Sequence, residues 1–160
     1  MAELIWVDDA EILAALNRLL VAVDNPRPAL LDAAEQLMQS TQQRFSTKTA
    51  PDGSQWDRNS DVTIARKGEN NPLIGGDIGV DGFRVGGGTL LQQFNYDLSD
   101  DGFDLFNTMQ YAAMQQFGGA KEEFPHLWGD IPARPFLGVS EDDKEHVLAI
   151  FTQFFERSLF

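Results

Sequence analysis

The sequence that decides the fold is residues 111–143, YAAMQQFGGAKEEFPHLWGDIPARPFLGVSEDD. Pro132 and Pro135 each fix φ near about −65° and push the residue before them into extended backbone. A helix or a central strand therefore cannot run through this segment, and we expect a stiff connector. Phe136 and Leu137 follow the second proline, so they should arrive at a fixed angle and anchor the last helix on a core. We call residues 131–138 (IPARPFLG) the hook; it contains no general acid, general base or nucleophile.

Arg134 is the residue of the hook that can make several polar contacts. From residue 73 onward the chain has five Lys and Arg against fourteen Asp and Glu, so this cation stands in a strongly acidic half. A guanidinium can fork onto a carboxylate or a carbonyl, and we expect Arg134 to lock the hook in this way. Upstream, Phe117 is expected to anchor the hook, while Gly118 and Gly119 allow the backbone to turn.

Two helices are predicted before residue 46. Asp8 or Asp9 caps the first, which runs through Val23 with apolar residues at three- and four-residue spacing. The second starts near Pro28, because proline suits a first helical turn, and its apolar residues share one face. The short prolyl turn between them predicts a helical hairpin. Residues 3–7 (ELIWV) form a short apolar run that is typical of a strand.

A β-hairpin and a final helix complete the expected fold. Residues 92–99 and 103–108 alternate apolar and polar side chains around the turn sequence Asp-Asp-Gly. Ser140 and Asp143 form a capping box that opens a terminal helix with a strongly aromatic face, which is either core or an oligomer seam. The sequence thus predicts an α+β fold, with an N-terminal helical hairpin and a C-terminal helix packed on a small antiparallel sheet.

The length of 160 residues suits one domain, residues 1–160. Within it, residues 46–89 are rich in Gly, Asn, Asp and Pro and predict an extended central loop with brief strands. Long loops in compact domains are usually functional or ordered by a partner, so this region is a candidate contact with another subunit. Trp56 lies in this loop, and it either caps the helical hairpin or inserts into a neighbour.

Composition excludes several classes of function. The net charge of −13 repels phosphate, which argues against sequence-specific DNA binding. The chain has no cysteine, so disulfides and zinc-thiolate sites are excluded. The first twelve residues contain only four consecutive apolar residues flanked by acids, so we expect a soluble protein with no membrane span.

Motifs for cofactors and catalysis are incomplete. Residues 82–89 (GFRVGGGT) have the glycines of a phosphate loop, but Gly88 stands where the lysine is needed. Residues 97–102 resemble the start of a calcium loop, but its twelfth position is Thr108. His126 and His146 are the only histidines and lie in different segments. We therefore expect no enzyme activity, no cofactor and no metal; the alternative is a small hydrolase or ligand-binding domain whose site is assembled in space.

Two stretches carry a resemblance to a known family. The first combines Tyr111 and Ala112 with QFGG at residues 116–119 and IPARPFLG at residues 131–138; the second is RFSTKTAPDGSQW at residues 44–56. With the order of helices, turn, sheet, hook and closing helix, the chain resembles the virion morphogenesis, or tail-completion, family of Mu-like contractile-tailed bacteriophages. The resemblance spans nearly the whole chain.

The resemblance implies a structural protein of the phage neck that completes the tail and enables head–tail joining around the DNA channel. The implied partners are further copies of the chain in a ring, which we expect to be six-fold, and the connector, terminator and tail tube. DNA is expected to pass nearby without sequence-specific binding. The implied location is the virion, with assembly in the host cytoplasm. The residues that we expect to have structural or interface roles are Trp56, Tyr111, Phe117, Gly118, Gly119, Pro132, Arg134, Pro135, Phe136 and Leu137.

Overall fold

The structure is a computed structural model of the chain, and it describes residues 10–67, 70, 72–73, 77–78, 84–85, 90–127 and 129–159. The strand predicted at residues 3–7 lies outside the described residues. The described elements are α1 (Ala10–Asp24), α2 (Arg27–Thr47), α3 (Asp61–Lys67), β1 (Asp77–Ile78), β2 (Arg84–Val85), a 3-10 turn (Leu90–Gln92), β3 (Phe94–Leu98), β4 (Phe103–Asn107), α4 (Ala112–Phe117) and α5 (Glu141–Leu159). The predicted α+β class is confirmed, with a helix-rich N-terminus and a C-terminal helix.

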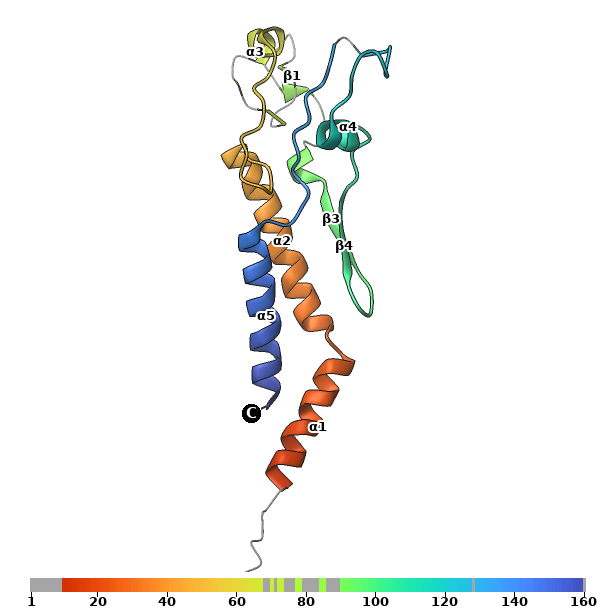
Figure 1. Cartoon of the computed structure of the whole chain (residues 1–160). Coiled ribbons are helices and arrows are strands. Elements are labelled where there is room, and N and C mark those ends of the chain that lie inside the picture. The colour runs from red at the N-terminus through yellow and green to blue at the C-terminus, as the bar shows by residue number, and fades with distance from the viewer. Residues whose placement is uncertain are drawn as a thin grey trace, which may run out of the picture.

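The first two helices do not fold back on each other as a hairpin. Figure 1 shows α1 continuing roughly along the line of α2, and both helices lie along α5. The reason is the backbone of the short turn between them. Pro26 has helical dihedral angles (φ −76°, ψ 0°), and its carbonyl accepts a hydrogen bond from Leu30 N at 3.0 Å. Asn25 N in turn donates to Val21 O at 3.1 Å, so the turn bends the helical path without reversing it.

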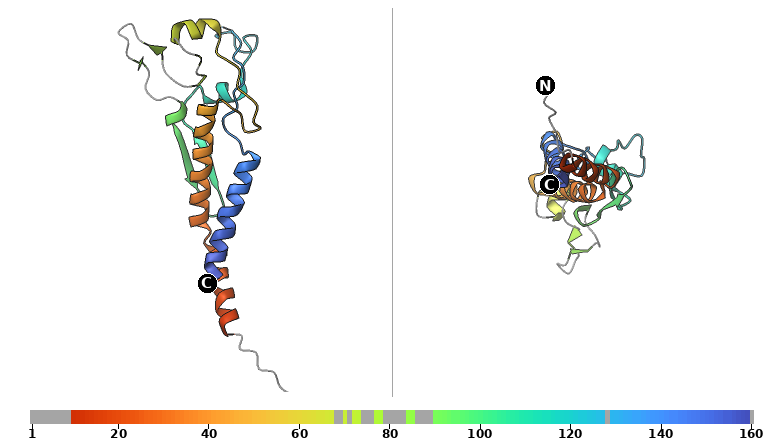
Figure 2. Two further views of the ribbon diagram at one scale, coloured as in Figure 1. Left: turned by 90° about the vertical axis from the view of Figure 1, so that its left-hand side faces the viewer. Right: turned by 90° about the horizontal axis from the view of Figure 1, so that it is seen from below.

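The predicted β-hairpin is confirmed as β3 and β4. Tyr96 pairs with Leu105 and Leu98 pairs with Phe103, so these four apolar residues share a face. At the turn, Ser99 N donates to Gly102 O at 2.9 Å. The hairpin packs on α2, and α5 packs on another side of the same helix (Figure 2). The C-terminal helix therefore packs mainly on α2 and α1. The sequence had predicted that it would pack on the sheet.

An aromatic core joins α2 to the hairpin and the hook. The ring of Phe45 is 5.3 Å from Trp56 and 5.7 Å from both Phe94 and Phe136, measured between centroids. Edge-to-face packing is the favoured geometry for such rings, and it is seen for Phe45 with Trp56 and with Phe94. Phe45 and Phe136 are fully buried.

The region predicted as a loop, residues 46–89, contains more helix than expected. α2 continues to Thr47 and ends at Lys48, which has the left-handed backbone (φ 58°) of a helix C-cap. The predicted Pro-Asp-Gly turn follows, with Gly53 N donating to Ala50 O at 2.9 Å and a positive φ of 83° at Gly53. The unpredicted helix α3 begins after Ser60, whose hydroxyl accepts a hydrogen bond from Thr63 N. Of the brief strands, β1 and β2 pair antiparallel.

No helix in the described parts of the chain combines the length and the apolar character that a membrane crossing requires.

Candidate functional site

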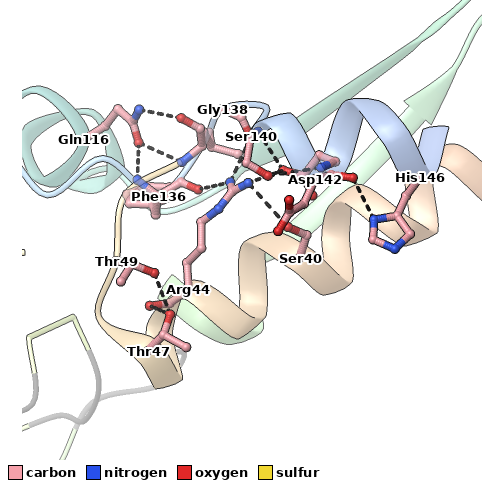
Figure 3. Close-up of polar contacts among 12 residues, drawn as sticks. Ser40, Arg44, Thr47, Thr49, Gln116, Phe136, Gly138, Ser140, Asp142 and His146 are labelled. Carbon is pink, nitrogen blue, oxygen red and sulfur yellow. Dashed lines mark hydrogen bonds and ion pairs between the residues drawn. The ribbon is translucent and has the colours of Figure 1, made fainter. Parts of the chain in front are cut away.

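The hook is fixed to α4 through the side chain of Gln116. Its Oε1 atom accepts hydrogen bonds from Phe136 N at 2.9 Å and Leu137 N at 3.0 Å, while its Nε2 atom donates to Leu137 O at 2.9 Å (Figure 3). One carboxamide therefore satisfies three backbone groups of a segment that is neither helix nor sheet. Gln116, the glutamine of the QFGG motif, therefore holds the hook in place, a role that its position in the sequence does not indicate.

The Gly-Gly pair allows the chain after α4 to lie against the start of the hook. Gly119 and Ile131 form an antiparallel bridge, with hydrogen bonds of 2.9 Å and 2.8 Å between their backbones. Gly118 has a φ of +75°, and a Cβ there would lie 2.8 Å from both Ala133 N and Ile131 O. Backbone conformation and space thus both require glycine at residue 118.

Arg134 locks the hook onto the segment that follows Trp56. Its guanidinium is buried and donates to two backbone carbonyls, from Nε to Asp57 O at 2.9 Å and from Nη2 to Arg58 O at 3.0 Å. Burial lowers the pKa of Arg134 from its ordinary value, and the nearby charge of Asp57 opposes this shift. The guanidinium therefore forks onto carbonyls, which is one of the two expected modes.

Trp56 packs inside its own subunit. Its ring is buried against Phe45, and its Nε1 atom donates to Pro135 O at 2.7 Å. Of the two alternatives for this residue, the observed contacts match the one in which Trp56 packs at the end of its own helix α2. Trp56 joins the end of α2 to the hook.

The polar centre that sequence reasoning missed is Arg44 of α2 with Asp143 of α5. Arg44 Nη1 donates to Phe136 O at 2.9 Å and to Gly138 O at 2.8 Å, and Nη2 forms an ion pair with Asp143 Oδ2 (Figure 3). Both side chains are almost fully buried. The pair lies 99 residues apart in the sequence, but one signal was present: Arg44 continues the seven-residue spacing of Leu30 and Leu37 on the apolar face of α2.

Asp143 also completes the predicted capping box. Its Oδ2 atom accepts from Ser140 N at 2.8 Å, and its own backbone N donates to Ser140 Oγ at 3.1 Å. Burial alone would raise the pKa of the Asp143 carboxyl, but hydrogen bonds from Ser40 and Ser140 and the charge of Arg44 outweigh burial and lower it. Burial likewise lowers the pKa of Arg44, against the opposing effect of Asp143.

Two residues for which a structural or interface role was expected lie on the surface. Phe117 is 79% exposed at the end of α4, so it does not anchor the hook from within. The helix ends at Phe117, and the turn at Gly118 places Gly119, not Phe117, against Ile131 of the hook. Tyr111 precedes α4 and is also exposed. In the hook, Phe136 is buried, and Pro132, Pro135 and Leu137 are half-buried.

An open groove of about 910 Å³ runs beside the Arg44–Asp143 pair. It is lined by α2, by the Pro-Asp-Gly turn and by the start of α5, including His146. The imidazole of His146 contacts the backbone, with Nδ1 2.7 Å from Asp142 O, and not a carboxylate. Among the described residues, no three His, Cys, Asp or Glu side chains group as metal ligands.

The β3–β4 hairpin gathers exposed carboxylates. Asp97 and Asp104 are directly opposite each other across the strands, and Asp100 and Asp101 form the turn. All four residues are exposed. Like charges in directly opposed positions destabilise a strand pair, so the hairpin carries this charge at a cost in stability.

The chain matches a family model described as the phage virion morphogenesis family, over residues 7–156. The matched range includes all the residues of the hook, the Gly-Gly turn and the Arg44–Asp143 pair. No curated protein and no solved structure gives a significant match.

Proposed function

The chain belongs to the phage virion morphogenesis family, and from this premise we propose that it is a structural protein of the virion neck. In this role it completes the tail and enables the head to join the tail around the DNA channel. The observation that carries the proposal is the family match over residues 7–156, because it includes every element that positions the hook. The chain acts by contacting its neighbours and turns over no substrate.

The internal contacts of the hook support a mechanical role. The side chains of Arg134, Gln116 and Arg44 all form hydrogen bonds with backbone groups of the same subunit. A segment held in this way has one fixed geometry before any partner binds. Such preorganisation suits a subunit that must fit between other proteins. The exposed side chain of Phe117, next to the fixed Gly-Gly turn, is then available to a neighbouring protein.

We further propose that several copies form a ring, which we expect to be six-fold, and that the ring contacts the connector, the terminator and the tail tube. Closed rings use two different patches of each subunit. The acidic hairpin and the more basic region around Arg58 differ in charge and would suit such contacts. An acidic surface turned toward the channel would also keep DNA from adhering as it passes.

The proposal is tested by removing the gene from the phage and examining the particles by electron microscopy. We expect full heads and free tails that do not join, and we expect purified protein to restore joining when it is added to an extract of the mutant. Particles that lack the protein and still join heads to tails at full efficiency would contradict the proposal.

A ligand-binding domain is the second candidate, and the groove beside Asp143 is the observation that favours it. Its two most buried charges, Arg44 and Asp143, are already paired with each other, which favours the structural role. Light scattering on the purified protein, with and without tail tubes, separates the two. Association with tubes, or a ring of more than two copies, supports the neck role, whereas a protein that forms no ring and does not bind tubes supports the ligand-binding alternative.

A further inference from the structure

Helix α1 exposes a regular apolar seam. Leu13, Leu16, Leu20 and Val23 are 52%, 50%, 61% and 54% exposed, and they follow one another at intervals of three, four and three residues. This is the a/d spacing of a coiled coil, in which such residues fit between those of a facing helix. We call these four residues the α1 seam. The seam is exposed although α1 is packed against the rest of the subunit, because a different face of the helix makes that contact.

That second face is held by α5 of the same subunit. Ala22 is buried, Ala15 and Leu19 are half-buried, and α1 packs against α5. Arg18 adds a hydrogen bond from Nη2 to Leu159 O at 2.7 Å. At about 100° per residue, the centre of this covered face lies about 130° around the helix from the centre of the seam, and Leu19 lies at the border between the two. α1 is therefore fixed in place by one face and presents the seam on another.

The charge of α1 indicates what can cover the seam. Among its 15 residues only Glu11, Arg18 and Asp24 are charged, which gives a net charge of −1 in a chain of net charge −13. Two copies of so acidic a protein repel each other over most of their surface, and α1 is a place where this repulsion is small. A coiled coil with a different partner is usually selected by charges beside the seam, at positions e and g. Here these positions are Ala10, Ile12, Asn17, Leu19 and Asp24, with no cation among them.

We propose that the free chain forms a homodimer in which the α1 seam of one copy packs against the α1 seam of a second copy. The seam is self-complementary, because its large apolar residues repeat at the spacing that a like helix can fill. The proposal goes beyond the neck function, since it concerns the protein before assembly. It does not require that the protein joins heads to tails.

Light scattering after size-exclusion chromatography tests the proposal on the full chain. At micromolar concentration we expect the wild-type mass to be twice the chain mass of 17.8 kDa. The double change Leu16→Asp and Leu20→Asp should return the mass to that of one chain, with an unchanged circular dichroism spectrum. The matched control is Leu148→Asp, at a leucine of α5 that is 69% exposed and lies outside the seam; it should keep the dimer. A wild-type monomer, or a seam variant that stays dimeric, would overturn the proposal.

Cross-linking gives a second test that does not depend on a disruptive substitution. The chain has no cysteine, so Leu20→Cys introduces a single thiol. A short bis-maleimide should convert this variant to covalent dimers, while Leu148→Cys should give none above the background of random collision. Equal yields from both variants would overturn the proposal. A wild-type chain that is monomeric in solution and still restores head–tail joining would overturn this inference and leave the neck function standing. Dimers from a protein that proves dispensable for joining would do the reverse.

Discussion

Arg134 illustrates how one side chain can hold an irregular segment in place. Its guanidinium satisfies the carbonyls of Asp57 and Arg58, which lie 77 and 76 residues away in the sequence. Leaving a buried acceptor unsatisfied costs about 1–3 kcal/mol. Because water can partly replace the guanidinium at these half-buried carbonyls, we expect Arg134→Ala to lower the free energy of unfolding by about 1–2 kcal/mol. Urea denaturation measures this change.

The control for Arg134 is Arg58→Ala. Arg58 forms an ion pair with Asp61 in which both side chains are largely exposed, and such pairs contribute little. Its removal should change the unfolding free energy by less than about 0.5 kcal/mol. If both arginine variants lower the unfolding free energy by the same amount, the locking role of Arg134 is wrong. A normal yield of virions with Arg134→Ala would also contradict it.

The Arg44–Asp143 pair predicts a larger effect. Asp143→Asn removes the carboxylate charge and leaves Arg44 buried without its counter-ion. Breaking a buried pair in this way typically costs about 3–5 kcal/mol, and we expect about 3 kcal/mol because the asparagine can still hydrogen-bond to Ser140. Glu141→Gln is the matched control in the same helical turn, since the bridge of Glu141 to Lys144 is exposed and should contribute less than about 1 kcal/mol.

The same pair predicts a pH dependence. The pKa of Asp143 is lower in the folded chain than its ordinary value of about 3.9. The folded state therefore binds this proton less readily than the unfolded state, and the stabilisation is complete above that ordinary value and lost as the pH falls through the folded pKa. The difference in unfolding free energy between wild type and Asp143→Asn should stay constant near neutral pH and shrink below about pH 4. A difference that does not vary over this range would contradict the assignment.

Phe117 and Phe136 have the same side chain in opposite surroundings. Phe136 is fully buried in the aromatic core, and truncation of such a residue to alanine costs about 3–5 kcal/mol. Phe117 is 79% exposed, so Phe117→Ser should change the unfolding free energy by less than about 0.5 kcal/mol. Thermal denaturation of both variants tests the contrast. If Phe117→Ser destabilises the isolated chain as strongly as Phe136→Ala, its exposed position is wrong.

At the scale of elements, local signals predicted the parts that depend on local chemistry. The turn at Asp100-Asp101-Gly102, the prolyl hook and the capping box at Ser140 each rest on a few adjacent residues, and the structure contains all three. The angle between α1 and α2 was missed, because it depends on one backbone conformation at Pro26. The exposure of Phe117 was missed for the same kind of reason, since Gly118 decides where the chain goes next.

The β3–β4 hairpin offers a prediction at this scale. Asp97 and Asp104 are directly opposite each other, and opposite charges at such positions stabilise a strand pair by about 0.2–1 kcal/mol, whereas like charges destabilise it. Asp104→Lys should therefore raise the unfolding free energy by about 0.5–1 kcal/mol. Asp101→Lys, in the turn and without a cross-strand partner, controls for the change in net charge. An equal gain from both substitutions would assign the effect to net charge and not to the pair.

At the scale of the whole molecule, the sequence predicted the fold class and the family but not the contact that closes the structure. The Arg44–Asp143 pair brings together α2, the hook and α5 from residues 99 positions apart. An arginine on an apolar helix face signals a buried charge, but it does not say which of the 25 acidic residues is its partner. That choice depends on where α5 packs, and hence on the three-dimensional path through the hook.

The acidic hairpin leads to a prediction for the assembled particle. If its exposed carboxylates face the DNA channel, they repel the phosphates of passing DNA, and their loss allows DNA to adhere. Changing Asp100, Asp101 and Asp104 together to asparagine should leave joined particles at normal yield but slow DNA ejection, as followed by fluorescence of a DNA-binding dye after ejection is triggered. The matched control neutralises three exposed acids on other elements, Glu122, Glu123 and Glu156, and should not slow ejection. An unchanged ejection rate in the hairpin variant would show that the hairpin does not face the DNA, and equal slowing in both variants would assign the effect to net charge.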